Sequence, residues 1–306
     1  YEYFTDSAAA FEAFKAGEYT FRNENSSLQW ATGYEFPSIE NGWVRKEELP
    51  DGSIGSAQAF IFNLRDPKFQ DPAVREAIRL MFNFEWSNET LFYGLYDRVD
   101  SFWQNSDLQA RGVPSMGELA LLQPLVDDGL LDASILTDEA VLSPTSDARR
   151  PTDRANLRLA SDLLAGAGWI AGDDGIRRKD GQTLSVEFLT ASPSFDRIIN
   201  PYIENLQRLG VEASLDRVDF AQYVERLNAP SEFDIITHTM TQGFEPGTSM
   251  RQWFASETAA DSSRNLMGLQ DEAIDRLMTI KLRELSRNPR ARPRSARRRV
   301  LGATMV

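Results

Sequence analysis

The sequence predicts an α/β fold, in which helices cover a largely parallel sheet. The main observation is an alternation of strand-like and helix-like apolar patterns between residues 183 and 239, in the order β-α-β-α-β. Such alternation is typical of parallel strands joined by crossover helices. Composition agrees, because 42% of the 306 residues are hydrophobic and 26% are charged, the proportions of a globular protein. No apolar run reaches the roughly 18 residues of a membrane span.

The first expected elements are a helix, a strand and a second helix. Residues 7–16, SAAAFEAFKA, read as a short helix closed by Gly17. Residues 57–65, AQAFIFNLR, alternate and are rich in Phe and Ile, which favours a strand. A helix begins after Asp71, whose side chain can accept a hydrogen bond from a first-turn N–H, and Pro72 takes its first position.

Two arginines of this second helix, Arg75 and Arg79, are four residues apart and therefore share one face. The apolar residues Val74, Ala77, Ile78, Met81 and Phe82 form a separate stripe. The local pattern therefore predicts an amphipathic helix whose arginine face is solvated.

The later elements are expected in a regular succession. Residues 117–136 are partly helical, residues 142–153 read as a loop, and Thr152 or Asp153 caps the next helix. The sequence KDGQ is typical of a hairpin turn. The remaining elements are a strand carrying Leu184, Val186 and Phe188, a helix at 195–209, a strand at 211–218, a helix at 219–227 and a buried strand at 232–240. Ligands of such sheets bind beyond the carboxyl ends of the strands, which directs attention to residues 241–254.

Charge divides the chain into two unequal parts. Residues 281–306 hold nine Lys or Arg and one acid, which leaves 24 basic and 45 acidic residues, a net charge of −21, in residues 1–280. An acidic body of this size repels nucleic acid, whose binding depends on neutralising phosphates. The tail lacks hydrophobic periodicity, so we expect a disordered or frame-shifted segment, with a functional basic arm as the alternative.

The sequence offers little catalytic chemistry. It has no cysteine, which excludes disulfides, thiolate catalysis and zinc–thiolate sites. His238 is the one histidine, and neither a G-x-S-x-G elbow nor a phosphate-binding loop is present. We expect no catalytic residue, no metal and no cofactor; a hydrolase using His238 is the alternative from another class. Trp30, Trp103 and Trp253 fall in expected loops, where core packing and ligand binding are both open.

Five segments resemble, in order, the family-5 extracellular solute-binding proteins, the peptide- and nickel-type binding subunits of bacterial ABC importers. They are YFTDSAAAFEAFKAGEYTF, FNLRDPKFQDPAVREAIRLMFNFE, ASDLLAGAGW, PYIENLQRLGVEASLDRVDFAQYVERL and EFDIITHTM, and the resemblance covers roughly residues 1–280. Residues 89–125, from ETLFYGLYDR to LLQPL, are similar to the Yej subgroup, whose members are associated with oligopeptides, murein-derived peptides and microcin C-type antibiotics.

The resemblance implies a periplasmic-binding-protein-like type II fold with two lobes and a hinge, represented here mainly by the second lobe. Residues 1–60 would end lobe 1 and approach the hinge, residues 61–280 would form lobe 2, and residues 281–306 would be the anomalous tail. The chain begins without Met or a signal peptide, so we expect a fragment lacking most of lobe 1. The motif around Arg75 would position the first helix of lobe 2 on its sheet.

The implied function is a non-catalytic, monomeric periplasmic subunit that captures an oligopeptide or modified peptide and delivers it to an inner-membrane ABC permease. A non-peptide solute is the alternative ligand, and no nucleic-acid partner is expected. The expected ligand contacts are Met240, Thr241, Gln242, Phe244 and Glu245 at the strand end, with Asn63, Arg65 and Trp103.

The chain departs from the family at the peptide amino terminus. Several peptide binders of the family place an Asp after the last strand of this lobe to pair with that amine, whereas here Gln242 or Gly243 stands there. Glu245 could replace the charge through a charge-assisted hydrogen bond, or backbone carbonyls could accept from the amine.

Overall fold

The computed structural model describes residues 2–4, 6–228, 232–243, 247, 249–260 and 264–287, with only the backbone given for residues 281–287. Of the predicted anomalous tail, residues 281–287 continue the last helix, and residues 288–306 lie outside the described residues.

The α-helices are α1 Ser7–Ala16, α2 Ser27–Thr32, α3 Pro37–Glu40, α4 Pro72–Leu80, α5 Phe84–Thr90, α6 Met116–Asp127, α7 Arg154–Gly166, α8 Asp196–Arg208, α9 Phe220–Asn228, α10 Met250–Phe254 and α11 Glu272–Arg287. The strands are β1 Ala57–Phe62, β2 Ile170–Ala171, β3 Arg177–Lys179, β4 Gln182–Thr183, β5 Ser185–Thr190, β6 Glu212–Arg217 and β7 Ile235–Met240. Short 3-10 turns are η1 Pro67–Phe69, η2 Ala133–Leu136, η3 Pro193–Phe195 and η4 Ser256–Thr258.

The main sheet confirms the predicted α/β alternation. Its strand order is β1-β7-β5-β6, and β5 runs parallel to both β6 and β7, with α8 and α9 as the crossovers. β1 joins the edge antiparallel to β7, with Ala57 opposite Met240 and Phe62 opposite Ile235. The predicted first strand is shorter than expected, because Asn63–Arg65 turn away from β7 towards η1. The KDGQ turn is confirmed, since Asp180 and Gly181 both have positive φ between β3 and β4.

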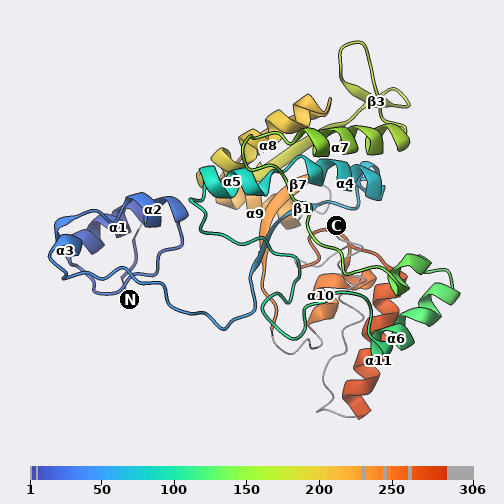
Figure 1. Cartoon of the computed structure of the whole chain (residues 1–306), viewed down its shortest axis with the longest axis horizontal. Helices are drawn as coiled ribbons and strands as arrows, with labels where there is room; N and C mark the ends of the chain where they lie inside the picture. The colour runs from blue at the N-terminus through green and yellow to red at the C-terminus, as the bar shows by residue number, and fades with distance from the viewer. Residues whose placement is uncertain are drawn as a thin grey trace.

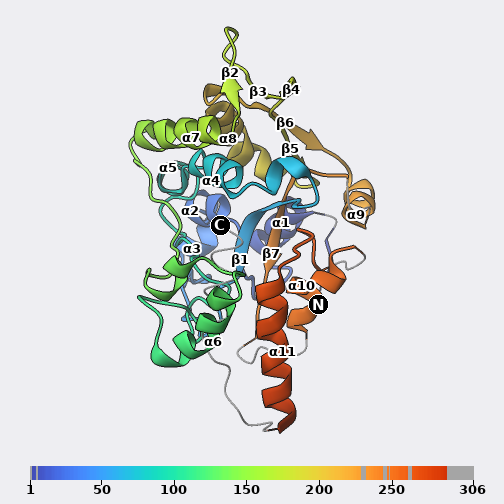
Figure 2. The ribbon, with the colours of Figure 1, turned by 90° about the vertical axis from the view of Figure 1, so that its right-hand side faces the viewer.

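Two helical layers enclose this sheet, as Figures 1 and 2 show. On one face, α4, α7 and α8 pack their apolar stripes against Val186 and Phe188. On the other face, α6, α10 and α11 cover Ile61, Ile236 and Met240. Both faces of β7 are therefore buried at its start, which is why this strand reads as a continuous apolar run.

Arg75 corrects the prediction of a solvated arginine face. Its residue exposure is 7%, and its Nη1 donates to the carbonyls of Phe69 at 2.6 Å and Gln70 at 3.1 Å. Burial lowers the pKa of Arg75. The local pattern failed because the acceptors belong to η1 and the residue after it, which lie just outside the helix. Arg79 keeps the expected surface position, paired with Glu76.

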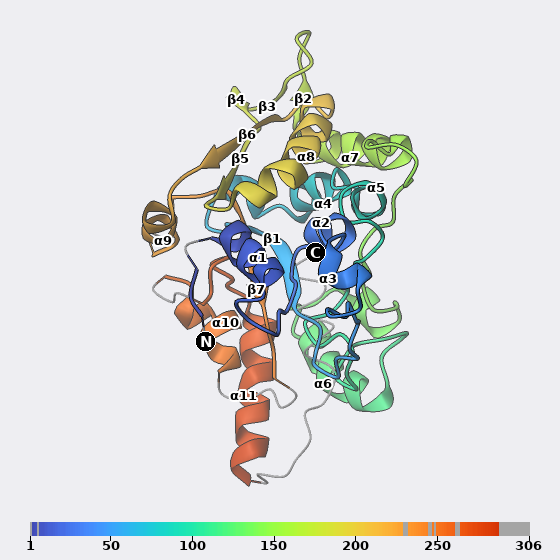
Figure 3. The ribbon, with the colours of Figure 1, turned by 90° about the vertical axis from the view of Figure 1, so that its left-hand side faces the viewer.

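The N-terminal unit, residues 6–44, has a small core of its own. Phe11, Phe14, Tyr34 and Phe36 form this core around α1 to α3, apart from the two larger cores. Residues 45–56, which contain neither helix nor strand, connect the unit to β1. Figure 3 shows the unit in front of the sheet, with α2 beside α5. The predicted domain boundary at residue 60 falls inside β1, which pairs with β7 along its whole length.

Candidate ligand-binding site

The carboxyl end of β7 is an open strand edge. The pairing of β5 with β7 is confined to Phe188 with Ile235 and Leu189 with Ile236, whereas β7 continues to Met240. Beyond Ile236, β7 therefore keeps β1 as a neighbour but has no strand on its other side among the described residues. This edge lies where ligands of parallel sheets bind.

The phase of the β1–β7 ladder determines which backbone groups face the open edge. The N–H of Asn63 donates to the carbonyl of Asp234 at 2.9 Å, and hydrogen-bonded pairs recur at every second residue of an antiparallel ladder. His238 and Met240 therefore bond to β1, and the N–H and carbonyl of Thr239 point away from it. The same alternation directs the carbonyl of Thr237 outward, where it accepts from the hydroxyl of Tyr223 at 3.1 Å.

The polar side chains of this edge share one face of β7. Thr237, Thr239 and Thr241 alternate with His238 and Met240, and both Thr239 and Thr241 are exposed. Gln58, the register partner of Thr239 on β1, is exposed as well. Of these residues the sequence predicted Thr241 as a ligand contact, but not Thr237, Thr239 or Gln58. The alternation T-H-T-M-T at residues 237–241 could have indicated that the threonines share one face. No sequence signal indicated the strand order that leaves this edge free.

Trp103 and Gln242 complete the strand end. Trp103 is 1% exposed, and its Nε1–H donates to the carbonyl of Gly243 at 3.3 Å. The loop carrying Trp103 is fixed by Gln104, whose carbonyl accepts from the N–H of Gly55 at 3.0 Å. The side-chain Nε2 of Gln242 is buried and has no hydrogen-bond partner among the described residues. A buried donor without a partner costs about 1–3 kcal/mol, a cost that a ligand carbonyl would remove.

The other expected strand-end residues fall into two groups. Met240 is 2% exposed and belongs to the core, so its side chain packs against protein. Phe244 and Glu245 lie outside the described residues.

Asn63 and Arg65 lie at the opposite end of the sheet. Asn63 is next to Asp234, about 20 Å along β7 from Met240 at 3.3 Å per residue. Its side-chain Nδ2 donates to the carbonyl of Phe233 at 2.9 Å. The structure therefore does not bring these two residues together with Gln242 and Trp103.

The guanidinium of Arg65 is satisfied by carbonyls of the chain itself. It donates to the carbonyls of Ala259 at 2.9 Å, Leu266 at 2.9 Å and Asn265 at 3.1 Å. Burial lowers the pKa of Arg65. Gly268 has φ +67° and closes over the guanidinium, because a Cβ there would lie 2.5 Å from Arg65 Cζ. These contacts fasten the chain between α10 and α11 to the end of β1.

The other residues considered from the sequence are His238 and the tryptophans Trp30, Trp103 and Trp253. His238 is half-buried with its ring centroid 6.1 Å from that of Trp253, and burial lowers the pKa of His238. Trp30 and Trp253 lie in α2 and α10, so the expectation that they sit in loops is wrong. Trp103 does lie in a loop but is buried. Among the described residues, no group of His, Cys, Asp or Glu side chains could hold a metal ion.

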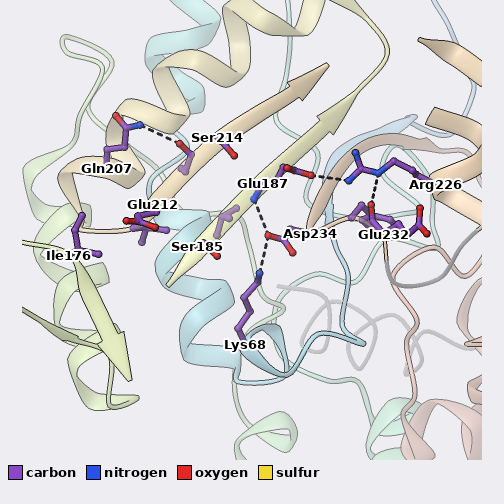
Figure 4. Close-up of a pocket in the computed structure, with 14 residues that line it drawn as sticks. Lys68, Ile176, Ser185, Glu187, Gln207, Glu212, Ser214, Arg226, Glu232 and Asp234 are labelled. Atoms are coloured by element: carbon purple, nitrogen blue, oxygen red, sulfur yellow. Dashed lines mark hydrogen bonds and ion pairs between the residues drawn. The ribbon is translucent and has the colours of Figure 1, made fainter. Parts of the chain in front are cut away.

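A second hollow, of about 1080 Å³, lies at the amino ends of β5 and β6 (Figure 4). Four of its charged residues form ion pairs: Lys68 with Asp234, and Arg226 with Glu187. Lys68 Nζ lies 2.9 Å from Asp234, whose carboxylate also accepts from the N–H of Glu187 at 2.9 Å. Arg226 binds Glu187 at 2.8 Å and Asp216 at 2.6 Å. This network bridges the gap where β5 and β7 diverge. We therefore interpret these charged side chains as holding the strands together.

Comparison with known proteins identifies the family. A family model described as bacterial extracellular solute-binding proteins, family 5 middle, matches residues 1–262. The chain belongs to this family. None of its described helices is long and apolar enough to cross a membrane.

Two relatives confirm the resemblance to the Yej subgroup. The probable peptide-binding protein YejA of Agrobacterium fabrum is 37% identical over 282 residues, which cover 91% of this chain and 45% of that protein. The uncharacterized protein YejA of Escherichia coli is 34% identical over 279 residues, with the same two coverages of 91% and 45%. The chain thus spans less than half the length of these family-5 relatives.

A solved structure confirms the predicted fold of a family-5 protein. The chain is similar to AppA, the oligopeptide-binding protein of Bacillus subtilis in complex with a nonapeptide, with a TM-score of 0.68 at 17% identity. The match covers 98% of this chain and 51% of AppA. At this identity the likeness shows the fold alone.

Proposed function

We propose that the chain is part of a non-catalytic substrate-binding subunit of an ABC importer, acting as a monomer in the periplasm. It would capture an oligopeptide or modified peptide and deliver it to a membrane permease. Family membership supports the binding role, and the name of the 37% identical YejA supports a peptide ligand.

The open edge of β7 is the observation that carries this proposal. An extended peptide would lie beside Thr239 and Thr241 and exchange main-chain hydrogen bonds with the N–H and carbonyl groups directed away from β1. Such pairing gives affinity without reading side chains, which suits a protein that accepts peptides of varied sequence.

The proposed side-chain contacts centre on Gln242. Its buried carboxamide would donate to a peptide carbonyl, and Trp103 would fix the adjoining backbone by holding the carbonyl of Gly243. We retain Phe244 and Glu245 as proposed contacts, with Glu245 facing the peptide amine. We assign Met240, Asn63 and Arg65 supporting roles, since their side chains are engaged within the protein.

Gln242→Ala tests this site. In the protein extended to the full length of its relatives, the substitution is expected to weaken peptide binding about tenfold, the effect of one hydrogen bond of about 1.4 kcal/mol. Isothermal titration with short uncharged peptides measures the affinity. The melting temperature is expected to stay within about 2 °C, because the substitution removes a donor that has no partner among the described residues.

The matched control is Gln123→Ala, on an exposed surface of α6. Unchanged peptide affinity in Gln242→Ala would remove Gln242 from the site. If no peptide of the panel binds the unsubstituted protein, the ligand is a solute other than a peptide, and the peptide part of the proposal fails while the family assignment stands.

A further inference from the structure

The open edge of β7 has a definite beginning, and this beginning lies beside α9. The phase of the β1–β7 ladder directs the main-chain groups of Ile235, Thr237 and Thr239 away from β1. Ile235 still lies opposite Phe188 of β5. Thr239 has no strand on this side among the described residues. Thr237 is therefore the position at which the sheet ends and the open edge begins.

The hydroxyl of Tyr223 occupies this position. It donates to the carbonyl of Thr237 at 3.1 Å, so the first outward carbonyl beyond the pairing with β5 is already bonded within the chain. The tyrosine is half-buried and packs against the core that contains Ile236 and Met240. Burial raises the pKa of Tyr223, so its hydroxyl keeps its proton and remains a donor at neutral pH.

The rest of α9 holds this tyrosine in place. Arg226, three residues after Tyr223, binds Glu187 of β5 at 2.8 Å and Asp216 of β6 at 2.6 Å. Figure 4 shows Arg226 beside Glu187. Leu227 packs against the same core as Tyr223. The helix is thus fastened to two strands and to the core, which fixes the hydroxyl at the edge of β7.

The end of β5 leaves this place to the tyrosine. Thr190, the last residue of β5, accepts from the N–H of Val218 at 3.1 Å, which is on the side of β6. The chain then turns into η3. Tyr223 therefore closes the gap between β5 and β7 at the carboxyl end of the sheet. A peptide lying along the open edge towards β5 would meet this side chain before it could pair with Thr237.

We propose that Tyr223 limits the peptide ladder, so that main-chain pairing with β7 extends as far as Thr239 and stops there. Tyr223 is thus a positioning residue, which fixes the register of the peptide and the number of its residues that the edge can hold. This inference rests on the proposed function, because it concerns the same edge. Outward main-chain groups recur at every second residue, so each position gained along β7 corresponds to about two peptide residues.

A series of uncharged peptides of increasing length tests this limit, in the protein extended to the full length of its relatives. The affinity of the unsubstituted protein, measured by isothermal titration, is expected to rise with length and then level off. Tyr223→Ala removes the hydroxyl and the ring. The affinity is then expected to level off about two residues later, and the longer peptides are expected to bind about fivefold more tightly through one added hydrogen bond.

Tyr223→Phe is the second variant, which keeps the packing of α9 if the alanine variant fails to fold. It frees the carbonyl of Thr237 but leaves the ring in place, so a smaller gain is expected for the same longer peptides. A purely structural role of the tyrosine would lower the affinity for peptides of every length and leave the levelling-off length unchanged.

Leu227→Ala is the matched control, because it disturbs the packing of α9 and leaves Tyr223 bonded to Thr237. A lower melting temperature with the original levelling-off length is expected. An unchanged levelling-off length in both Tyr223 variants would overturn the inference and leave the peptide-binding role standing, as would an equal shift in Leu227→Ala. If no peptide binds the unsubstituted protein, the peptide part of the proposed function fails and this inference fails with it.

Discussion

Arginines that fasten backbone turns are the main residue-scale feature of this chain. Arg65, Arg75 and Arg177 each donate to backbone carbonyls, and burial lowers the pKa of all three. Arg177 reaches the carbonyls of Leu209 at 2.7 Å and Trp169 at 2.9 Å, and so joins the ends of α8 and α7. Amphipathic pattern cannot predict such positions, because the acceptors are turn carbonyls that folding brings together.

Arg75→Met is expected to lower the free energy of unfolding by about 2–3 kcal/mol, because it leaves the buried carbonyl of Phe69 and the part-buried carbonyl of Gln70 without their charged donor. Urea unfolding measures this change. Arg79→Met is the matched control on the same helix and is expected to cost under about 1 kcal/mol, since its pair with Glu76 is partly exposed. Equal losses in the two variants would contradict the structural role of Arg75.

His238 is expected to make stability depend on pH. Burial lowers its pKa in the folded state, so the unfolded chain binds a proton more readily. The contribution is therefore complete above the unfolded pKa of about 6.5 and is lost as the pH falls through the lower folded pKa. Between pH 7.5 and 5, His238→Gln should show a shallower decline in the free energy of unfolding. Parallel curves would mean that His238 does not titrate on unfolding.

At the scale of elements, local signals determined what could be predicted. The cap Asp71, which accepts from the N–H of Ala73 at 2.9 Å, and the turn at Asp180 and Gly181 were predictable because each depends on a few adjacent residues. The open edge of β7 was not, because it results from β5 ending early and from β1 crossing over to pair antiparallel. The sequence consequently predicts Gln242 as a contact and gives no reason to name Thr239, although the two lie three residues apart.

Thr239→Pro tests the open edge directly. Proline removes an N–H that points away from β1, and strands tolerate it where that N–H is unpaired. Peptide affinity is expected to fall at least tenfold with a modest change in stability. His238→Pro, one residue away, removes an N–H that bonds to β1 and is expected to unfold the strand. Greater destabilisation by Thr239→Pro than by His238→Pro would show that the ladder has the opposite phase, and calorimetry distinguishes the cases.

At the scale of the whole molecule, the described chain consists of parts whose hydrophobic cores differ in size. The main body has two extended cores on the faces of its sheet, whereas the N-terminal unit buries little more than four aromatic side chains. A small core contributes little to the free energy of unfolding. The chain spans about 45% of the length of its relatives. The expected division, with residues 1–60 ending lobe 1 and residues 61–280 forming lobe 2, stays a prediction, and β1 pairs with β7 along its whole length.

Amide hydrogen exchange is expected to separate these parts. Amides of α1 should exchange at least a hundredfold faster than those of α4, because the unit can open without unfolding the main body. Exchange followed by mass spectrometry of peptides from each helix measures the ratio. Equal protection in α1 and α4 would show that the two parts unfold as one cooperative unit.

The contact between Arg65 and Gly268 has a consequence for how this family can diverge. The space that a side chain would need at residue 268 is filled by the guanidinium of residue 65, so neither position can change freely alone. A shorter residue at 65 would leave three carbonyls without their donor, and the φ of +67° would still favour glycine at 268. Among homologous sequences, lineages that keep arginine at 65 should therefore also keep glycine at 268.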